Sequence, residues 1–218
     1  LGAVLHATVL GRIVLQRLPD CGLVPFAPEQ LRALTPWRLD AVPDTAAPRS
    51  VSRASVPRDW RLEDLQDPRF VEIGRGRLDP SECGRDQLVT PRQLVGRVSD
   101  GIVHLIAAHR GAEALGARRA GETGGAVIEY FAEYRRPLRA GDLFTVRSAL
   151  AGLGGKTQRL AHFLFDATTG ALVMAARGTA VTLDLRTRRA VALDEATRAR
   201  LADWLVEDPR LWPPVAGT

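Results

Sequence analysis

The segment 90–110, TPRQLVGRVSDGIVHLIAAHR, constrains the fold more than any other part of the chain. Thr90 is suited to cap a helix, Pro91 suits the first helical position, and Gln93 completes a Thr-x-x-Gln capping box. Apolar residues then recur at helical spacing: Leu94, Val95, Val98, Ile102, Leu105 and Ile106. The pattern predicts a long helix packed on a core.

The opposite side of this helix lacks the charges of a solvated face. Its residues are mostly small or apolar: Gly96, Ser99, Asp100 and Val103. A helix with apolar residues on one side and small residues on the other is expected to be covered on both sides. Asp100 would then be a partly buried carboxylate, which makes it a candidate for chemistry.

The chain after this helix is predicted to form an antiparallel meander. Gly-containing turns separate four long β-type segments, and a further strand precedes the helix. The expected strands are 70–80, 126–137, 143–153, 156–166 and 171–185. Residues 111–125 are interpreted as a Gly-rich connection, and 194–207 as a terminal helix capped by Asp194. The expected fold class is α+β, because such a sheet must curl around the helix to bury its apolar face.

Three regions are expected along the chain. Residues 1–35 form a β-rich N-terminal segment, 36–65 a Pro/Ala/Arg-rich linker, and 66–210 the main domain. The alternative for the linker is a strap wrapped over the main domain and anchored by Trp37 and Trp60.

Charge and cysteine content narrow the function. The net charge is +5, and among the 30 basic residues only Lys156 is a lysine. The arginines are scattered rather than clustered, so no nucleic-acid partner is expected, although the balance favours anionic ligands. Cys21 and Cys83 are too few for a disulfide framework and lack metal-ligand spacing, which predicts a cytoplasmic setting. The apolar opening, interrupted by His6 and Arg12, is too short to span a membrane.

Three stretches resemble the hot-dog fold thioesterases of the 4-hydroxybenzoyl-CoA thioesterase type. They are EYRRPLRAGDLFTVRSAL (133–150), GGKTQRLAHFLFDATTGALVMAA (154–176) and AVTLDLRTRRAVAL (180–193). They carry the family's RPL-x-AGD phrase and a Lys-x-x-Arg hairpin at Lys156 and Arg159. The resemblance implies a hot-dog domain that hydrolyses an acyl-CoA or acyl-carrier thioester, with coenzyme A in the substrate and no cofactor. It also implies a homodimer or tetramer with sites at the subunit interface, and residues 1–35 would fit part of a second hot-dog.

The chain departs from this family at the catalytic loop. Many members carry an Asp before the helix, followed by Gly-His-Met, and that register places Gly84 at the Asp and Leu88 at the His. Asp86 could replace the missing carboxylate only if the loop were reshaped. A second branch of the family carries its carboxylate on the helix, where Asp100 matches it. An alternative for Asp100 is an ion pair with an arginine such as Arg97 of a neighbouring chain.

Thioester hydrolysis needs a polarised carbonyl and an activated water. The free N–H groups of the helix start, around Thr90 and Gln93, can hold the developing oxyanion. Asp100 or Asp86 would act as general base or nucleophile. The resemblance further implies that four basic residues near strand ends bind the CoA phosphates: Arg135, Arg136, Lys156 and Arg159. The alternative is that they are ordinary surface charges.

Other functions remain open at this point. A hot-dog protein that binds an acyl thioester without catalysis, in a regulatory or assembly role, is the main alternative. A dehydratase or hydratase would need a paired Asp and His, which the sequence does not show. His162 alternates with Leu160 and Leu164 along a strand and is interpreted as a core or interface histidine rather than a base.

Overall fold

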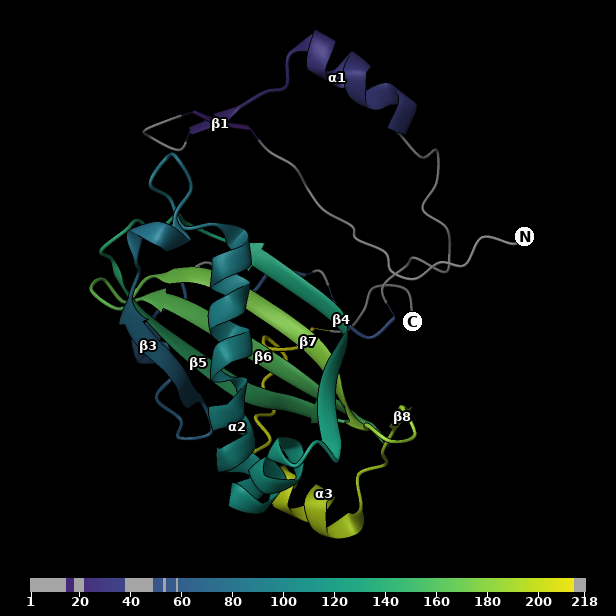
Figure 1. Ribbon diagram of the computed structural model, residues 1–218. Coiled ribbons are helices and arrows are strands. Elements are labelled where there is room, and N and C mark those ends of the chain that lie inside the picture. The colour runs from purple at the N-terminus through teal and green to yellow at the C-terminus, as the bar shows by residue number, and fades with distance from the viewer. Residues whose placement is uncertain (1–14, 18–21, 38–48, 53, 58, 214–218) are drawn as a thin grey trace. The chain divides into compact units, whose positions relative to one another are not determined.

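The computed structural model describes residues 15–17, 22–37, 49–52, 54–57 and 59–213 (Figure 1). The chain divides into two compact units, Leu1–Pro48 and Arg49–Thr218.

The described part of the N-terminal unit contains a short hairpin and one α-helix. Strand β1 (Leu15–Arg17) pairs antiparallel with β2 (Gly22–Val24). Helix α1 (Pro28–Leu34) follows, with Pro at its first turn, and a 3-10 turn, η1 (Thr35–Trp37), ends the described part of this unit. No residue of α1 is buried within the chain. Cys21 lies outside the described residues.

The second unit is built on a six-stranded antiparallel sheet with the strand order β3-β5-β6-β7-β4, and β8 pairs with β7. Its strands are β3 (Val71–Arg77), β4 (Thr123–Tyr134), β5 (Leu143–Leu153), β6 (Thr157–Asp166), β7 (Leu172–Asp184) and β8 (Arg189–Ala190). Two 3-10 turns, η3 (Leu62–Asp64) and η4 (Pro80–Glu82), lie before and after β3. Helix α2 (Pro91–Arg119) lies across one face of this sheet, between its two edges (Figure 1). This is the predicted α+β hot-dog architecture, a long helix wrapped by a curled antiparallel sheet.

Helix α2 begins where the sequence predicts and continues further. The Thr90 hydroxyl accepts the Gln93 N–H at 3.4 Å, but the reciprocal bond of the capping box is not formed, because the Thr90 N–H donates to the Glu82 carbonyl. The predicted connection at 111–125 is wrong in its first half, which is helical. Gly111 adopts φ 76° and breaks the helix there, a conformation that glycine takes without a steric penalty.

The contact of α2 with β3 depends on a glycine. A Cβ on Gly101 would lie 2.3 Å from the carbonyl oxygen of Ile73. The backbones of α2 and β3 are therefore in direct contact here, with no room for a side chain between them. The core between helix and sheet is continuous around this point. Its large, fully buried side chains are Ile73, Leu78, Leu105, Leu138, Val146, Leu150, Leu164, Met174 and Leu201.

The other face of the sheet is covered by the chain itself. A second apolar cluster joins two segments to the sheet: residues 49–65, called the strap below, and the C-terminal residues 206–211. Its members include Val56, Trp60, Leu65, Phe70, Phe163, Phe165, Val206 and Leu211. Trp60 packs edge-on to Phe163, with ring centroids 5.2 Å apart. Trp60 is thus an anchor of this strap, and Trp37 lies in the N-terminal unit.

Two charged residues fix the strap. Arg177 of β7 is buried and donates to three carbonyl oxygens, those of Leu211 (2.7 Å), Ser52 (3.1 Å) and Ala54 (2.6 Å). Glu129 of β4 accepts the backbone N–H groups of residues 49–51 at 2.7–3.0 Å. Burial raises the pKa of Glu129, and these bonds outweigh that effect and lower its pKa overall.

After the sheet, α3 (Glu195–Ala202) begins where predicted. Its N-cap Asp194 accepts the Thr197 N–H at 2.7 Å. The helix ends before residue 207, and a parallel bridge between Leu205 and Leu150 carries the chain past β5.

The close approach at Gly101 can be tested by adding one methyl group. Gly101→Ala is expected to lower the free energy of unfolding by about 1–3 kcal/mol, because the Ile73 carbonyl cannot move without disturbing β3. Gly116→Ala is the matched control in the same helix. Its Cβ would meet nothing within 4 Å, so helix propensity should raise stability by up to about 1 kcal/mol. Equal effects of both changes in urea unfolding would contradict the close contact.

Candidate functional site

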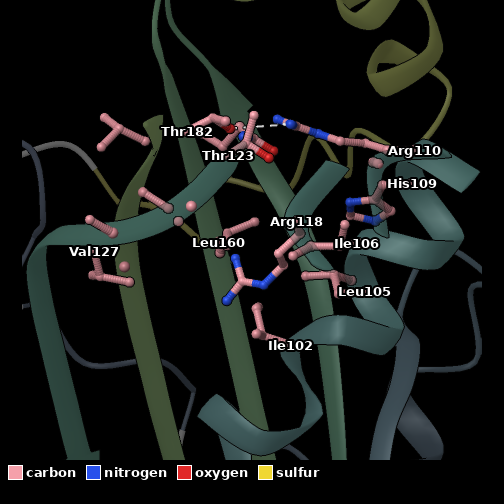
Figure 2. Close-up of a pocket in the computed structure, with 18 of the residues that line it drawn as sticks. Ile102, Leu105, Ile106, His109, Arg110, Arg118, Thr123, Val127, Leu160 and Thr182 are labelled. Atoms are coloured by element: carbon pink, nitrogen blue, oxygen red, sulfur yellow. Dashed lines mark hydrogen bonds between the residues drawn. The ribbon is translucent and has the colours of Figure 1, made fainter. Parts of the chain in front are cut away.

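A cavity of about 650 Å³ lies between α2 and the sheet, on the side of the helix toward β4 (Figure 2). Its walls come from α2, β4, β6, β7 and the start of α3. The apolar lining residues are Val98, Ile102, Leu105, Ile106, Val127, Leu160, Ala180 and Val181. This volume falls within the range of about 300–1,000 Å³ typical of small-molecule sites.

The break in α2 shapes one end of this cavity. The helical segment after Gly111 contributes Ala114, Ala117 and Arg118 to the lining. Across the cavity, Gly125 of β4 leaves room for Arg118, since a Cβ there would lie 3.2 Å from the Arg118 Nη1. Sequence reasoning missed these residues, because it placed them in a connection rather than in a helix.

Charged groups gather at the same end. Five of them line the cavity: Arg110, Glu113, Arg118, Asp194 and Arg200. Arg110 donates from Nη1 to the Thr182 hydroxyl at 3.2 Å (Figure 2). Burial lowers the pKa of Arg110, and the nearby Asp194 partly opposes this.

A buried polar pair contributes to the sheet side of the cavity. The Ser148 hydroxyl and Nδ1 of His162 are 2.7 Å apart, and both side chains are almost fully buried. Burial lowers the pKa of His162 to about 4, so the ring is neutral near pH 7. A neutral ring donates from one nitrogen and accepts at the other, so this bond has two possible directions, set by the tautomer. His162 also lines the cavity.

Asp100 does not reach the cavity. Within the chain it is exposed, so the predicted partial burial is wrong for the single chain. The physical reason is geometric: the sheet covers only one side of α2, and Ser99 and Ile102 on that side line the cavity while Asp100 points away. Arg97, considered as a partner for Asp100 between chains, forms an ion pair with Glu82 of its own chain.

The other predicted catalytic residues lie at the start of α2. The Asp86 carboxylate accepts the Leu88 N–H at 3.0 Å, which closes a turn in the loop before the helix. Thr90 caps the helix, and Gln93 lies in its first turn, where its N–H reaches Thr90. None of these residues lines the cavity, so the structure does not bring them together with Arg110 or His162.

The predicted phosphate-binding residues fall into two groups. Arg135 is half-buried, and its guanidinium already has partners. It pairs with Glu133 at 2.8 Å and donates to the Val56 carbonyl of the strap at 2.8 Å. Arg136, Lys156 and Arg159 are exposed, with the Arg159 guanidinium 5.7 Å from the Trp212 ring centroid. Only the second group is free to receive a ligand.

Metal chemistry finds no support in the described part of the chain, where no three His, Cys, Asp or Glu side chains gather as a metal site would require. Cys83 is unpaired, and burial raises the pKa of its thiol. Among the helices described, none is both long and apolar enough to cross a bilayer.

The two buried histidines predict a pH-dependent stability. His109, stacked near Trp204, also has a pKa lowered by burial to about 4, below the value of about 6.5 in an unfolded chain. A depressed histidine pKa means that the unfolded state gains protons first as the pH falls, so stability is lost from pH 6.5 downward. Between pH 7 and pH 5 each histidine should cost on the order of 2 kcal/mol.

Urea unfolding at several pH values measures this loss. The double variant Ser148→Ala with His162→Leu removes one of the two groups without leaving an unpaired hydroxyl, and it should roughly halve the loss between pH 7 and pH 5. An unchanged pH dependence in that variant would show that His162 is not neutral in the folded protein.

The comparisons with known proteins agree with this architecture. Among solved structures, the chain is similar to a probable thioesterase from Escherichia coli, with 22% identity and a TM-score of 0.51 over 61% of this chain and 98% of that chain. It is also similar to a hypothetical protein from Staphylococcus aureus in complex with CoA (15% identity, TM-score 0.54, 68% of this chain and 90% of that chain). A 12:0-ACP thioesterase from Umbellularia californica matches with 14% identity and a TM-score of 0.55, over 67% of this chain and 58% of that chain.

At these identities the solved structures show a shared fold. No curated protein sequence matches the chain. Residues 89–201, just over half of the chain, match the Thioesterase-like superfamily. The match spans α2, the meander and most of α3, which are the elements that surround the cavity. The chain therefore belongs to the thioesterase-like, hot-dog superfamily.

Proposed function

We propose that this protein hydrolyses acyl-CoA or acyl-carrier thioesters, and that the cavity beside α2 holds the acyl group. The observation that carries the proposal is the cavity itself, a largely apolar space of about 650 Å³ in a hot-dog domain. An apolar acyl chain gains about 0.8 kcal/mol for each methylene buried in such a space. The CoA complex of the Staphylococcus aureus protein and the acyl-ACP substrate named for the plant enzyme support this class of ligand.

The reaction requires water to attack the thioester carbonyl carbon, the C–S bond to break, and the thiolate to leave with a proton. The start of α2 supplies the oxyanion donors, through the free N–H groups of its first turn near Gln93. Asp100 is the proposed general base, with Asp86 as the second candidate. Because Asp100 is exposed in the single chain, a second subunit must enclose it for this role.

The edge strand β4 offers a surface for that second subunit. Among the strands that the structure describes, β4 pairs only with β7, and four large apolar or aromatic side chains along it are exposed: Val127, Ile128, Tyr130 and Tyr134. An exposed edge of this kind is a template for pairing with another strand. We propose a homodimer formed through β4, with exposed Arg136, Lys156 and Arg159 available for the CoA phosphates. A tetramer would have to use other surfaces than the covered outer face of the sheet.

A second function is favoured by one observation. Neither Asp100 nor Asp86 lines the cavity, so the protein could bind an acyl thioester without hydrolysing it. Such a protein would serve as a regulator or assembly partner. Binding without turnover is the outcome that separates it from an enzyme.

Hydrolysis of a panel of short, long and aromatic acyl-CoAs tests the proposal. The wild type should release CoA, and Asp100→Asn should lower kcat by about 100-fold or more at unchanged oligomeric state. Asp86→Asn is the parallel variant, and it should leave most of the activity if the loop carboxylate only closes a turn. If no acyl-CoA is hydrolysed while one of them binds, the non-catalytic function is correct.

The placement of the acyl group can be tested by filling the cavity. Ala114→Trp adds bulk to the lining, so it should lower kcat/KM for long-chain acyl-CoAs by about 10-fold or more, with less effect on acetyl-CoA. Ala112→Trp, two residues earlier on the same segment, is exposed and does not line the cavity. It should leave both activities close to wild type. Similar losses in the two variants would place the acyl group elsewhere.

A further inference from the structure

The side chain of Arg118 lies in the cavity without a partner for its charge. Figure 2 shows it reaching from α2 across the cavity toward Leu160. Within the described part of the chain, no carboxylate forms an ion pair with it and no hydrogen bond uses its guanidinium. Two other half-buried arginines of this unit have carboxylate partners: Arg97 pairs with Glu82 and Arg135 with Glu133.

The neighbourhood leaves room for this guanidinium and does not neutralise it. Gly125 provides the space on β4, because any larger residue would crowd the Arg118 Nη1. Of the two carboxylates that line the cavity, Asp194 is engaged by the N–H and hydroxyl of Thr197, and Glu113 is exposed.

Arg110 adds a second cation to the same cavity, and Asp194 lies near it. Its Nη1 reaches Thr182, whereas its Nη2 is buried and has no hydrogen-bond partner among the described residues. Guanidinium groups keep their proton at any physiological pH, so both residues stay charged, and the buried Nη2 of Arg110 carries the cost of a missing hydrogen bond. An anion in the cavity would remove that cost.

We propose that the cavity selects acyl groups that end in a carboxylate, which Arg118 binds while Arg110 adds positive potential. This inference rests on the proposed function, since it assigns the ligand's acyl end to the cavity. A carboxylate suits the planar fork of a guanidinium, which can donate two parallel N–H bonds to it. The apolar walls between Val98 and Ile106 then accept the methylenes that link this carboxylate to the thioester.

Binding of non-hydrolysable CoA thioethers tests the inference without requiring turnover. Calorimetry would compare S-carboxyalkyl-CoA with S-alkyl-CoA of matched length, from the succinyl-like to the suberyl-like chain. The wild type should bind the carboxyalkyl probe about 10- to 100-fold more tightly, as expected for a charged hydrogen bond. Arg118→Gln should abolish this preference. Arg119→Gln removes the same charge from the next, exposed residue outside the cavity and should keep the preference.

The CoA phosphates are common to both probes, so the ratio of affinities reports only the acyl end. Equal weakening of both probes by Arg118→Gln would mean that Arg118 binds a phosphate, and it would overturn the inference. A wild type that hydrolyses acyl-CoAs but does not discriminate between the probes would overturn the inference and leave the proposed function standing. Failure to bind either probe would overturn the inference, and if no acyl-CoA is hydrolysed either, it would also exclude CoA thioesters as substrates.

Discussion

The close approach of α2 to β3 at Gly101 determines where the helix lies on the sheet. Because no side chain separates the helix backbone from the Ile73 carbonyl, α2 is drawn toward the β3 edge. A helix displaced toward one edge cannot fill the space at the other. The cavity beside β4 is therefore a consequence of the packing on the β3 side. The close contact at Gly101 leaves unfilled space between α2 and β4.

The break at Gly111 gives this cavity its polar end. A straight helix would carry Ala114, Ala117 and Arg118 onward along its original axis, whereas the positive φ of Gly111 redirects the segment that contributes them to the lining. The first part of α2 thus supplies apolar walls, and the second part adds Glu113 and Arg118 to a charged end that Arg110, Asp194 and Arg200 also line. This division suits a ligand with an apolar chain and a polar terminus.

The sequence allowed prediction of what depends on local signals. The start of α2 at Pro91 and the strand 143–153 were predictable because capping residues and Gly-containing turns act over a few residues. The extension of α2 past Gly111 was not, since a glycine there is equally typical of a loop. Long-range contacts at the site could not be read from the sequence: Arg135 donates to the strap, and Asp100 is exposed in the single chain because the sheet covers only one side of the helix.

The position of the strap in the sequence has a consequence for the order in which this domain assembles. Its partners come from β4 through Glu129, from β7 through Arg177, and from the C-terminal Trp212, whose indole N–H donates to the Ser50 carbonyl. All of them follow the strap in the chain, the last by 162 residues. During synthesis the strap leaves the ribosome before any of its partners exist. The strap is therefore the first part of the domain to be synthesised and among the last to form its native contacts.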